Sequence, residues 1–100
     1  MSRYTVYIIP RAWREVKNLP GNVRQRIKRA IDALADDPRP SRSESLNVPD
    51  FDGELRRLRL DKWRIVYVVI ETDSTVDVVA VRKRPPYDYG DLAVLLEEAP

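Results

Sequence analysis

Apolar side chains recur along the chain with two different periods, which separate the expected strands from the expected helices. Residues 3–9 (RYTVYII) are rich in β-branched and aromatic types, a composition typical of a strand. Between Pro10 and Pro20 a partial helical stripe predicts a short first helix. A second helix is expected after Asn22, a residue type that caps helices. Its apolar face consists of Val23, Ile27, Ala30, Ile31 and Leu34.

The second half of the chain predicts a loop followed by three strands. Residues 38–53 are rich in Pro, Ser, Asn and Asp, a composition typical of a loop. The runs 54–60, 63–71 and 75–84 each have the composition of a strand, and the middle run is apolar on both faces, as expected of a central strand. Residues 92–96 predict a short C-terminal helix. We therefore expect an α+β fold, a helical hairpin packed on a mostly antiparallel four-stranded sheet in the order β-α-α-β-β-β.

Composition limits the chemistry that this chain can perform. One hundred residues predict a single domain, 1–100. The chain contains no cysteine and no histidine, so we expect no metal site and no cofactor, and any catalysis must use Arg, Lys, Tyr, Asp or Glu. Apolar runs are far shorter than the roughly 18 residues of a membrane span. We expect a cytoplasmic protein without a membrane partner.

The net charge of +2 conceals an uneven distribution of charged residues. Residues 11–29, 56–64 and 82–84 are basic, whereas residues 88–100 carry acidic side chains and no basic one. If Asp61 and Lys62 form a two-residue turn, Arg59 lies opposite Arg64. A three-residue turn at 72–74 then places Arg64 opposite Arg82. One face of the sheet would carry Arg57, Arg59, Arg64, Arg82 and Arg84, although neither turn contains the glycine that such turns favour.

Arginines directly opposite one another repel, by roughly several tenths of a kcal/mol per pair. Folding alone does not account for such a cluster, and guanidinium groups match phosphate oxygens in a bidentate fashion, so a phosphodiester is the expected ligand. The alternative is a solvated face, its arginines paired with Glu54, Asp61 or Asp88.

Other polar residues are open to two interpretations. The basic residues of the second helix are either its solvated face or a contact to ribosomal RNA. Tyr87 and Tyr89 lie beside the basic strand end and could stack on a base or transfer a proton. The helical set consists of Arg24, Arg26, Lys28 and Arg29.

The segments RLRLDKWRIVY (57–67) and VVAVRKRPPYDYGDL (78–92) resemble the RelE/ParE superfamily of type II toxins. The order of elements is also similar, and the likeness covers nearly the whole chain. It implies a toxin that is neutralised by a cognate antitoxin in a hetero-oligomer. RelE-like members cleave messenger RNA in the ribosomal A site, where the 2′-hydroxyl of the RNA attacks and a 2′,3′-cyclic phosphate is left.

The resemblance also implies roles for individual residues. Basic catalytic residues match Arg57 and Arg59, catalytic arginines match Arg64 and Arg84, and Tyr87 or Tyr89 matches a catalytic tyrosine. Further contacts to RNA are expected from Arg82, Lys83 and Lys62.

The general base is left open, because this chain departs from the best-known RelE pattern, which has lysines where Arg57 and Arg59 stand. An arginine stays protonated. The candidates are a tyrosine, Lys62, Lys83 or a water. Two other functions compete with the nuclease: a ParE-like DNA gyrase inhibitor, and a binding module without activity.

Overall fold

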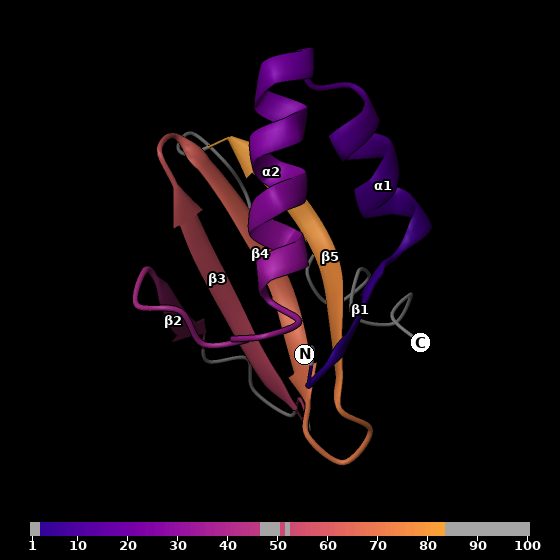
Figure 1. Ribbon diagram of the computed structural model, residues 1–100, viewed down its shortest axis with the longest axis vertical. Coiled ribbons are helices and arrows are strands. Elements are labelled where there is room, and N and C mark those ends of the chain that lie inside the picture. The colour runs from indigo at the N-terminus through magenta and orange to yellow at the C-terminus, as the bar shows by residue number, and fades with distance from the viewer. Residues whose placement is uncertain (1–2, 47–50, 52, 84–100) are drawn as a thin grey trace.

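Two helices lie over one face of a five-stranded sheet in the computed structural model, which describes residues 3–46, 51 and 53–83 (Figure 1). This confirms the expected α+β class. The expected C-terminal helix at 92–96 lies outside the described residues. The elements are β1 (Thr5–Ile8), α1 (Pro10–Lys17), α2 (Gly21–Ala33), β2 (Ser43–Leu46), β3 (Glu54–Leu60), β4 (Trp63–Ile70) and β5 (Thr75–Lys83).

The strand order in the sheet is β1-β5-β4-β3-β2. β1 pairs with β5 in parallel, and every other neighbouring pair is antiparallel. β4 lies in the middle, and its residues 64–69 are all buried, which confirms the central strand that the apolar run predicted. The two edges of the sheet are formed by β1 and β2, the shortest strands.

β2 corrects the expected strand count from four to five. It lies within residues 38–53, which the composition predicted to be a loop, and it pairs with β3 from Ser43 opposite Leu58 to Leu46 opposite Leu55. Its sequence, SESL, has none of the β-branched or aromatic residues that mark a strand. The strand forms because the edge of β3 offers backbone hydrogen-bonding groups, a tertiary effect that local composition does not contain.

The register of the β3–β4 hairpin agrees with the prediction, including Arg59 opposite Arg64 and Leu60 opposite Trp63. Asp61 takes the place of the missing glycine, because its φ of 53° lies in the left-handed region, which Asp tolerates better than most residues. The predicted pairing of Glu71 with Thr75 is wrong: Ile70 faces Thr75. An irregularity between Val66 and Tyr67 then shifts the register by one, so that Arg64 still lies opposite Arg82.

The apolar stripe of α2 packs against the sheet, as its periodicity predicted. Ile27 and Ile31 have no exposed surface and Leu34 has 1%. Asn22 is not the N-cap, because the helix begins at Gly21 and Pro20 holds the cap position without a side-chain hydrogen bond. The helix therefore depends for its stability on the burial of this stripe.

An ion-pair network joins the loop after α2 to the start of β3 and the end of β4. The Arg39 guanidinium contacts the carboxylates of Glu54 at 2.6 Å and Glu71 at 2.7 Å. The Tyr4 hydroxyl donates to Glu71 at 2.9 Å, and Arg56 contacts Glu54 at 2.7 Å. Hydrogen bonding from Arg39 is the largest cause that lowers the pKa of both carboxyls below the ordinary value of 4.5.

This network predicts a loss of stability in acid that depends on Glu54. A lowered pKa in the folded state means that the stabilisation is complete above the unfolded-state pKa, near 4.5, and is lost as the pH falls through the lower folded-state value. The difference in unfolding free energy between wild type and Glu54→Gln should therefore be largest near pH 7 and shrink in acid. Urea unfolding from pH 7 down to pH 3 measures it, with Asp36→Asn as the exposed control. A difference independent of pH would contradict this assignment.

Candidate nucleic-acid interface

Four arginines lie in register across the sheet, three of them in β3, β4 and β5 and one directly before β2. Arg59 faces Arg64 across the β3–β4 hairpin, and Arg64 faces Arg82 across β4 and β5. The Arg59 amide donates to the carbonyl of Arg42 at 3.2 Å, which continues the β2–β3 register by one pair beyond Ser43 and Leu58. Because paired residues of antiparallel strands share a face, Arg42, Arg59, Arg64 and Arg82 form one line across the sheet, called here the arginine row.

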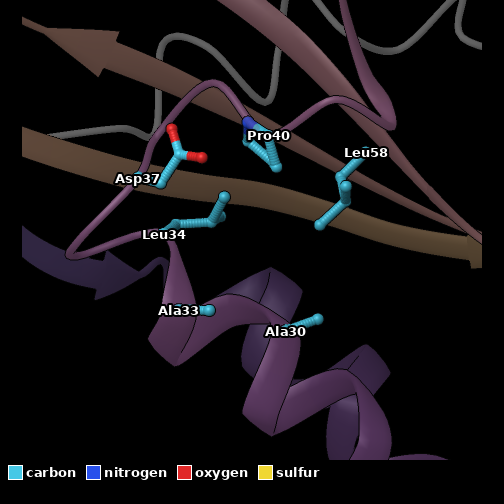
Figure 2. A pocket seen from close by; sticks show the side chains of 6 residues that line it. All are labelled: Ala30, Ala33, Leu34, Asp37, Pro40 and Leu58. Carbon is cyan, nitrogen blue, oxygen red and sulfur yellow. The ribbon is translucent and has the colours of Figure 1, made fainter.

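The arginine row lies on the sheet face opposite the helices. Leu58 points toward α2, where it lines an apolar hollow of about 250 Å³ together with Ala30 and Ala33 (Figure 2). Successive residues of a strand point to opposite faces, so Arg57 and Arg59 project away from the helices. This arrangement separates the apolar hollow, whose walls do not suit a phosphate, from the cationic face.

Only part of the positive charge on this face is neutralised by carboxylates. Arg57 forms an ion pair with Glu44 across β2 and β3, and Arg82 approaches Glu15 at 3.4 Å. Within residues 3–46, 51 and 53–83, no carboxylate lies at ion-pair distance from Arg59 or Arg64. Two of the partners that the alternative names, Glu54 and Asp61, pair instead with other arginines, and the third, Asp88, lies outside the described residues.

Arg64 is positioned by the hairpin turn itself. It is 9% exposed, and its Nη1 atom donates to the carbonyl oxygens of Asp61 and Trp63, both at 2.8 Å. Carbonyls orient a guanidinium without cancelling its charge, and arginine has five N–H donors in a rigid fork. Arg64 is thus a fixed cation in the middle of the face.

Glu15 of α1 holds Arg82 from the side of the sheet. β1 pairs with β5 only as far as Ile8 and Val78. In the described part of the chain, the C-terminal residues 79–83 of β5 therefore have no strand neighbour on that side. The Glu15 carboxylate accepts a hydrogen bond from the amide of Val81 at 3.1 Å and lies 3.4 Å from Arg82 Nε. The sequence offered no sign of this contact, because it joins residues 66 and 67 positions apart.

Several residues predicted to bind RNA lie away from the arginine row. Lys83 pairs with Trp63 and so belongs to the face that carries the helices. Lys62 is exposed in the turn. The basic residues of α2 lie on the helix side, and three of them have partners there: Arg26 with Asp61, Lys28 with Asp32, and Arg24 with the Lys17 carbonyl. Arg84, Tyr87 and Tyr89 lie outside the described residues.

Asp77 is a buried carboxyl on the same face, 2% exposed, with Oδ2 unpartnered among the described residues. Burial raises the pKa of this carboxyl, a shift often found in catalytic acids and bases. Its position excludes that role here, because Asp77 is five residues from Arg82 along β5, roughly 16 Å at 3.3 Å per residue.

Neither a metal-binding cluster nor a membrane-spanning helix is found in the described part of the chain. Among residues 3–46, 51 and 53–83, no group of three or more acidic, cysteine or histidine side chains gathers as a metal site would require. No helix in the described ranges is long and apolar enough to cross a bilayer.

The family assignment follows from a match over most of the chain. A sequence model described as the ParE toxin of the type II toxin–antitoxin system, parDE, matches residues 6–85. The chain belongs to this toxin family. The resemblance to the RelE/ParE superfamily is thereby confirmed, and the chain is a toxin of the RelE type within a toxin–antitoxin system.

Relatives of this ParE-family chain carry RelE names. RelE1 of Methanocaldococcus jannaschii, named as a toxin, is 26% identical over 82 residues, which cover 82% of this chain and 91% of the relative. Isolated E. coli RelE has a TM-score of 0.68 at 26% identity, with 91% of this chain and 95% of RelE covered. The RelE–RelB complex of Pyrococcus horikoshii gives 0.75 at 24% identity, with 85% and 99% covered, and shows the shared fold. The intact E. coli RelBE complex gives 0.66 at 27%, with 80% and 95% covered.

Proposed function

We propose that this toxin is a ribosome-dependent endoribonuclease that cleaves messenger RNA and so inhibits translation. The observation that carries the proposal is the pairing of Arg59 with Arg64 on one sheet face, without carboxylate partners in the described part of the chain. Opposed cations of this kind cost folding free energy, and a polyanion relieves that cost. RNA is a polyanion whose phosphates fit guanidinium forks.

The proposed chemistry is transfer of a phosphoryl group within the RNA. The 2′-oxygen attacks the adjacent phosphorus, the bond from phosphorus to the 5′-oxygen of the next nucleotide breaks, and the products carry a 2′,3′-cyclic phosphate and a 5′-hydroxyl. Fixed cations stabilise the extra negative charge of the transition state, which is the larger part of catalysis in phosphoryl transfer. Arg57, Arg59 and Arg64 take this role, together with Arg84 by resemblance.

The proton of the 2′-hydroxyl requires a base that no arginine supplies. Tyr87, Tyr89, Lys62 and a water remain the candidates, whereas Lys83 belongs to the face of the sheet that carries the helices. Asp77 is not among them, because it is too remote from the arginine row. The tyrosine carried by the resemblance, Tyr87 or Tyr89, also suits protonation of the leaving 5′-oxygen or stacking on a base.

The proposed partners are a cognate antitoxin, the ribosome and its messenger, which places the protein in the cytoplasm. RelE relatives form complexes with RelB antitoxins, as in E. coli, and a hetero-oligomer of this kind is expected here. An antitoxin that covers the arginine row or displaces residues 92–96 would block access of RNA. A complex in which both stay uncovered would contradict this mode of inhibition.

The deciding experiment adds purified toxin to ribosomes programmed with a defined messenger. Cuts in the A-site codon, mapped by primer extension, are the expected result, and intact messenger at saturating toxin would reject the nuclease. Chemical analysis of the new 3′ end should find a cyclic phosphate.

A ParE-like inhibitor of DNA gyrase is the second candidate, favoured by the name of the family model that matches this chain. It predicts inhibition of gyrase supercoiling and intact messenger, whereas the nuclease predicts the reverse. Both assays use the same purified toxin, so one preparation separates the two functions.

A further inference from the structure

Arg42 belongs to the arginine row, although the sequence pattern gave no reason to include it. It precedes β2, in a stretch predicted to be a loop, and only the pairing with β3 brings it beside Arg59. It is exposed, and within the described ranges it has no carboxylate at ion-pair distance. Within the described residues, the row therefore extends to the β2 edge of the sheet with a third cation, after Arg59 and Arg64, that no carboxylate neutralises.

A hollow of about 270 Å³ lies at this end of the arginine row, lined by Arg42, Arg59 and Asp61. Its walls are predominantly polar. Arg26 of α2 forms an ion pair with the Asp61 carboxylate. Hydrogen bonding from Arg26 lowers the pKa of Asp61, and the charges of Arg26 and Arg42 lower it further. The carboxyl group of Asp61 therefore stays ionised.

We propose that this hollow is a phosphate subsite that binds the RNA backbone next to the scissile phosphate, with Arg42 and Arg59 as its ligands. The inference rests on the proposed nuclease function and extends it by naming a further binding residue. RNA that crosses the sheet along the row passes from Arg64 to Arg59 and then to Arg42. Neighbouring strands are about 4.8 Å apart, so Arg42 lies roughly 10 Å from Arg64, beyond the central cation.

Charge favours a phosphate over a base in this hollow. Arg42 and Arg59 contribute two positive charges, and the negative charge of Asp61 is already engaged by Arg26. A phosphate accepts hydrogen bonds from both guanidinium groups, whereas Asp61 opposes it only weakly. If the hollow instead read a base, the Asp61 carboxylate would be an attractive acceptor for base N–H groups. Removal of the Asp61 charge should therefore strengthen binding if the ligand is a phosphate and weaken binding if the ligand is a base.

The first test measures single-turnover cleavage on programmed ribosomes as a function of toxin concentration. Arg42→Ala should raise the half-saturating concentration roughly three- to tenfold, as expected for one exposed ionic contact, and leave the maximal rate within about twofold. Arg3→Ala, which removes an exposed arginine just before β1, where Thr5 pairs with Thr75 at the end of β5 remote from Arg82, is the matched control and should change neither value. The backbone contact of Arg42 with Arg59 is kept in the variant, so the fold should be retained, and circular dichroism checks this.

Asp61→Asn is the second variant. Asn tolerates the positive φ of this position as well as Asp does, so the turn is kept. Removal of the negative charge should lower the half-saturating concentration roughly two- to threefold if a phosphate binds. A raised half-saturating concentration or a changed codon preference would overturn the proposal in favour of a base.

A messenger with a neutral methylphosphonate at each phosphate flanking the cleavage site completes the test. At one of the two positions, the methylphosphonate should raise the half-saturating concentration of wild type and of Arg42→Ala to the same final value. This is expected because both changes remove the same contact, between Arg42 and the phosphate. If the effects of the methylphosphonate and of Arg42→Ala on the half-saturating concentration are fully additive at both positions, Arg42 binds a different group and the proposal is overturned. If wild type cleaves normally and Arg42→Ala is indistinguishable from it, the subsite fails while the nuclease stands. If wild type does not cleave, it is the proposed function that fails.

Discussion

Replacing Arg64 with alanine is expected to reduce cleavage of ribosome-bound messenger by about 10²–10³-fold, in effect abolishing it. Arg64 is the largest expected contributor because it lies in the middle of the arginine row, is 9% exposed and is oriented by the carbonyls of Asp61 and Trp63. A buried, oriented cation stabilises transition-state charge more strongly than an exposed one does. Single-turnover rates at saturating toxin measure the effect on the maximal rate.

Arg64→Lys is the matched variant for this experiment. It keeps the charge but loses the planar fork, so we expect a rate between those of wild type and Arg64→Ala. The hydrogen bonds to the turn carbonyls could also support the hairpin, so urea unfolding must show that Arg64→Ala is folded at the assay temperature. Cleavage by a folded Arg64→Ala protein at more than about a tenth of the wild-type rate would contradict the role of Arg64.

Truncation of Ile31 to alanine is expected to have the largest effect on stability, with a loss of about 2–5 kcal/mol in the free energy of unfolding. Ile31 lies on the buried stripe of α2 and has no exposed surface. The change removes buried apolar atoms and leaves a cavity against the sheet, since close-packed neighbours relax only partly. Equilibrium urea unfolding at neutral pH measures the loss.

Asp32→Ala, at the next position of α2, is the control for Ile31→Ala. Asp32 is exposed and its carboxylate contacts Lys28 at 3.5 Å, so its removal should change stability by no more than about 0.5 kcal/mol. Equal losses in the two variants would mean that α2 is not held by its apolar face.

The predicted face of Arg57, Arg59 and Arg64 is correct because strand periodicity is a local property. Side chains alternate between faces every residue, and a two-residue turn fixes which residues oppose each other. Asp61 could replace glycine because its side chain tolerates a positive φ. The prediction for the β4–β5 turn failed because neither turn length nor the irregularity at Val66 has a marker in the sequence.

Other parts of the candidate site had no signal in the sequence. Arg42 lies in a polar segment that bonds to the edge of β3, and Glu15 meets Val81 and Arg82 across more than 60 intervening residues. The position of Arg26 against Asp61 depends on how α2 lies on the sheet. Each of these contacts joins distant segments, and local propensity carries no information about such pairs.

By itself, the sequence determined the two helices and four of the five strands, the buried face of α2, the burial of the central strand on both faces, and the gathering of arginines on one side of a hairpin. Periods of 3.6 and 2 residues encode these features directly in the order of residues. Only the tertiary structure decided that β2 exists, that the row reaches Arg42, and which cations meet a carboxylate. The physical reason is that strand pairing at an edge and ion pairing between elements depend on positions in space, which the whole fold sets at once.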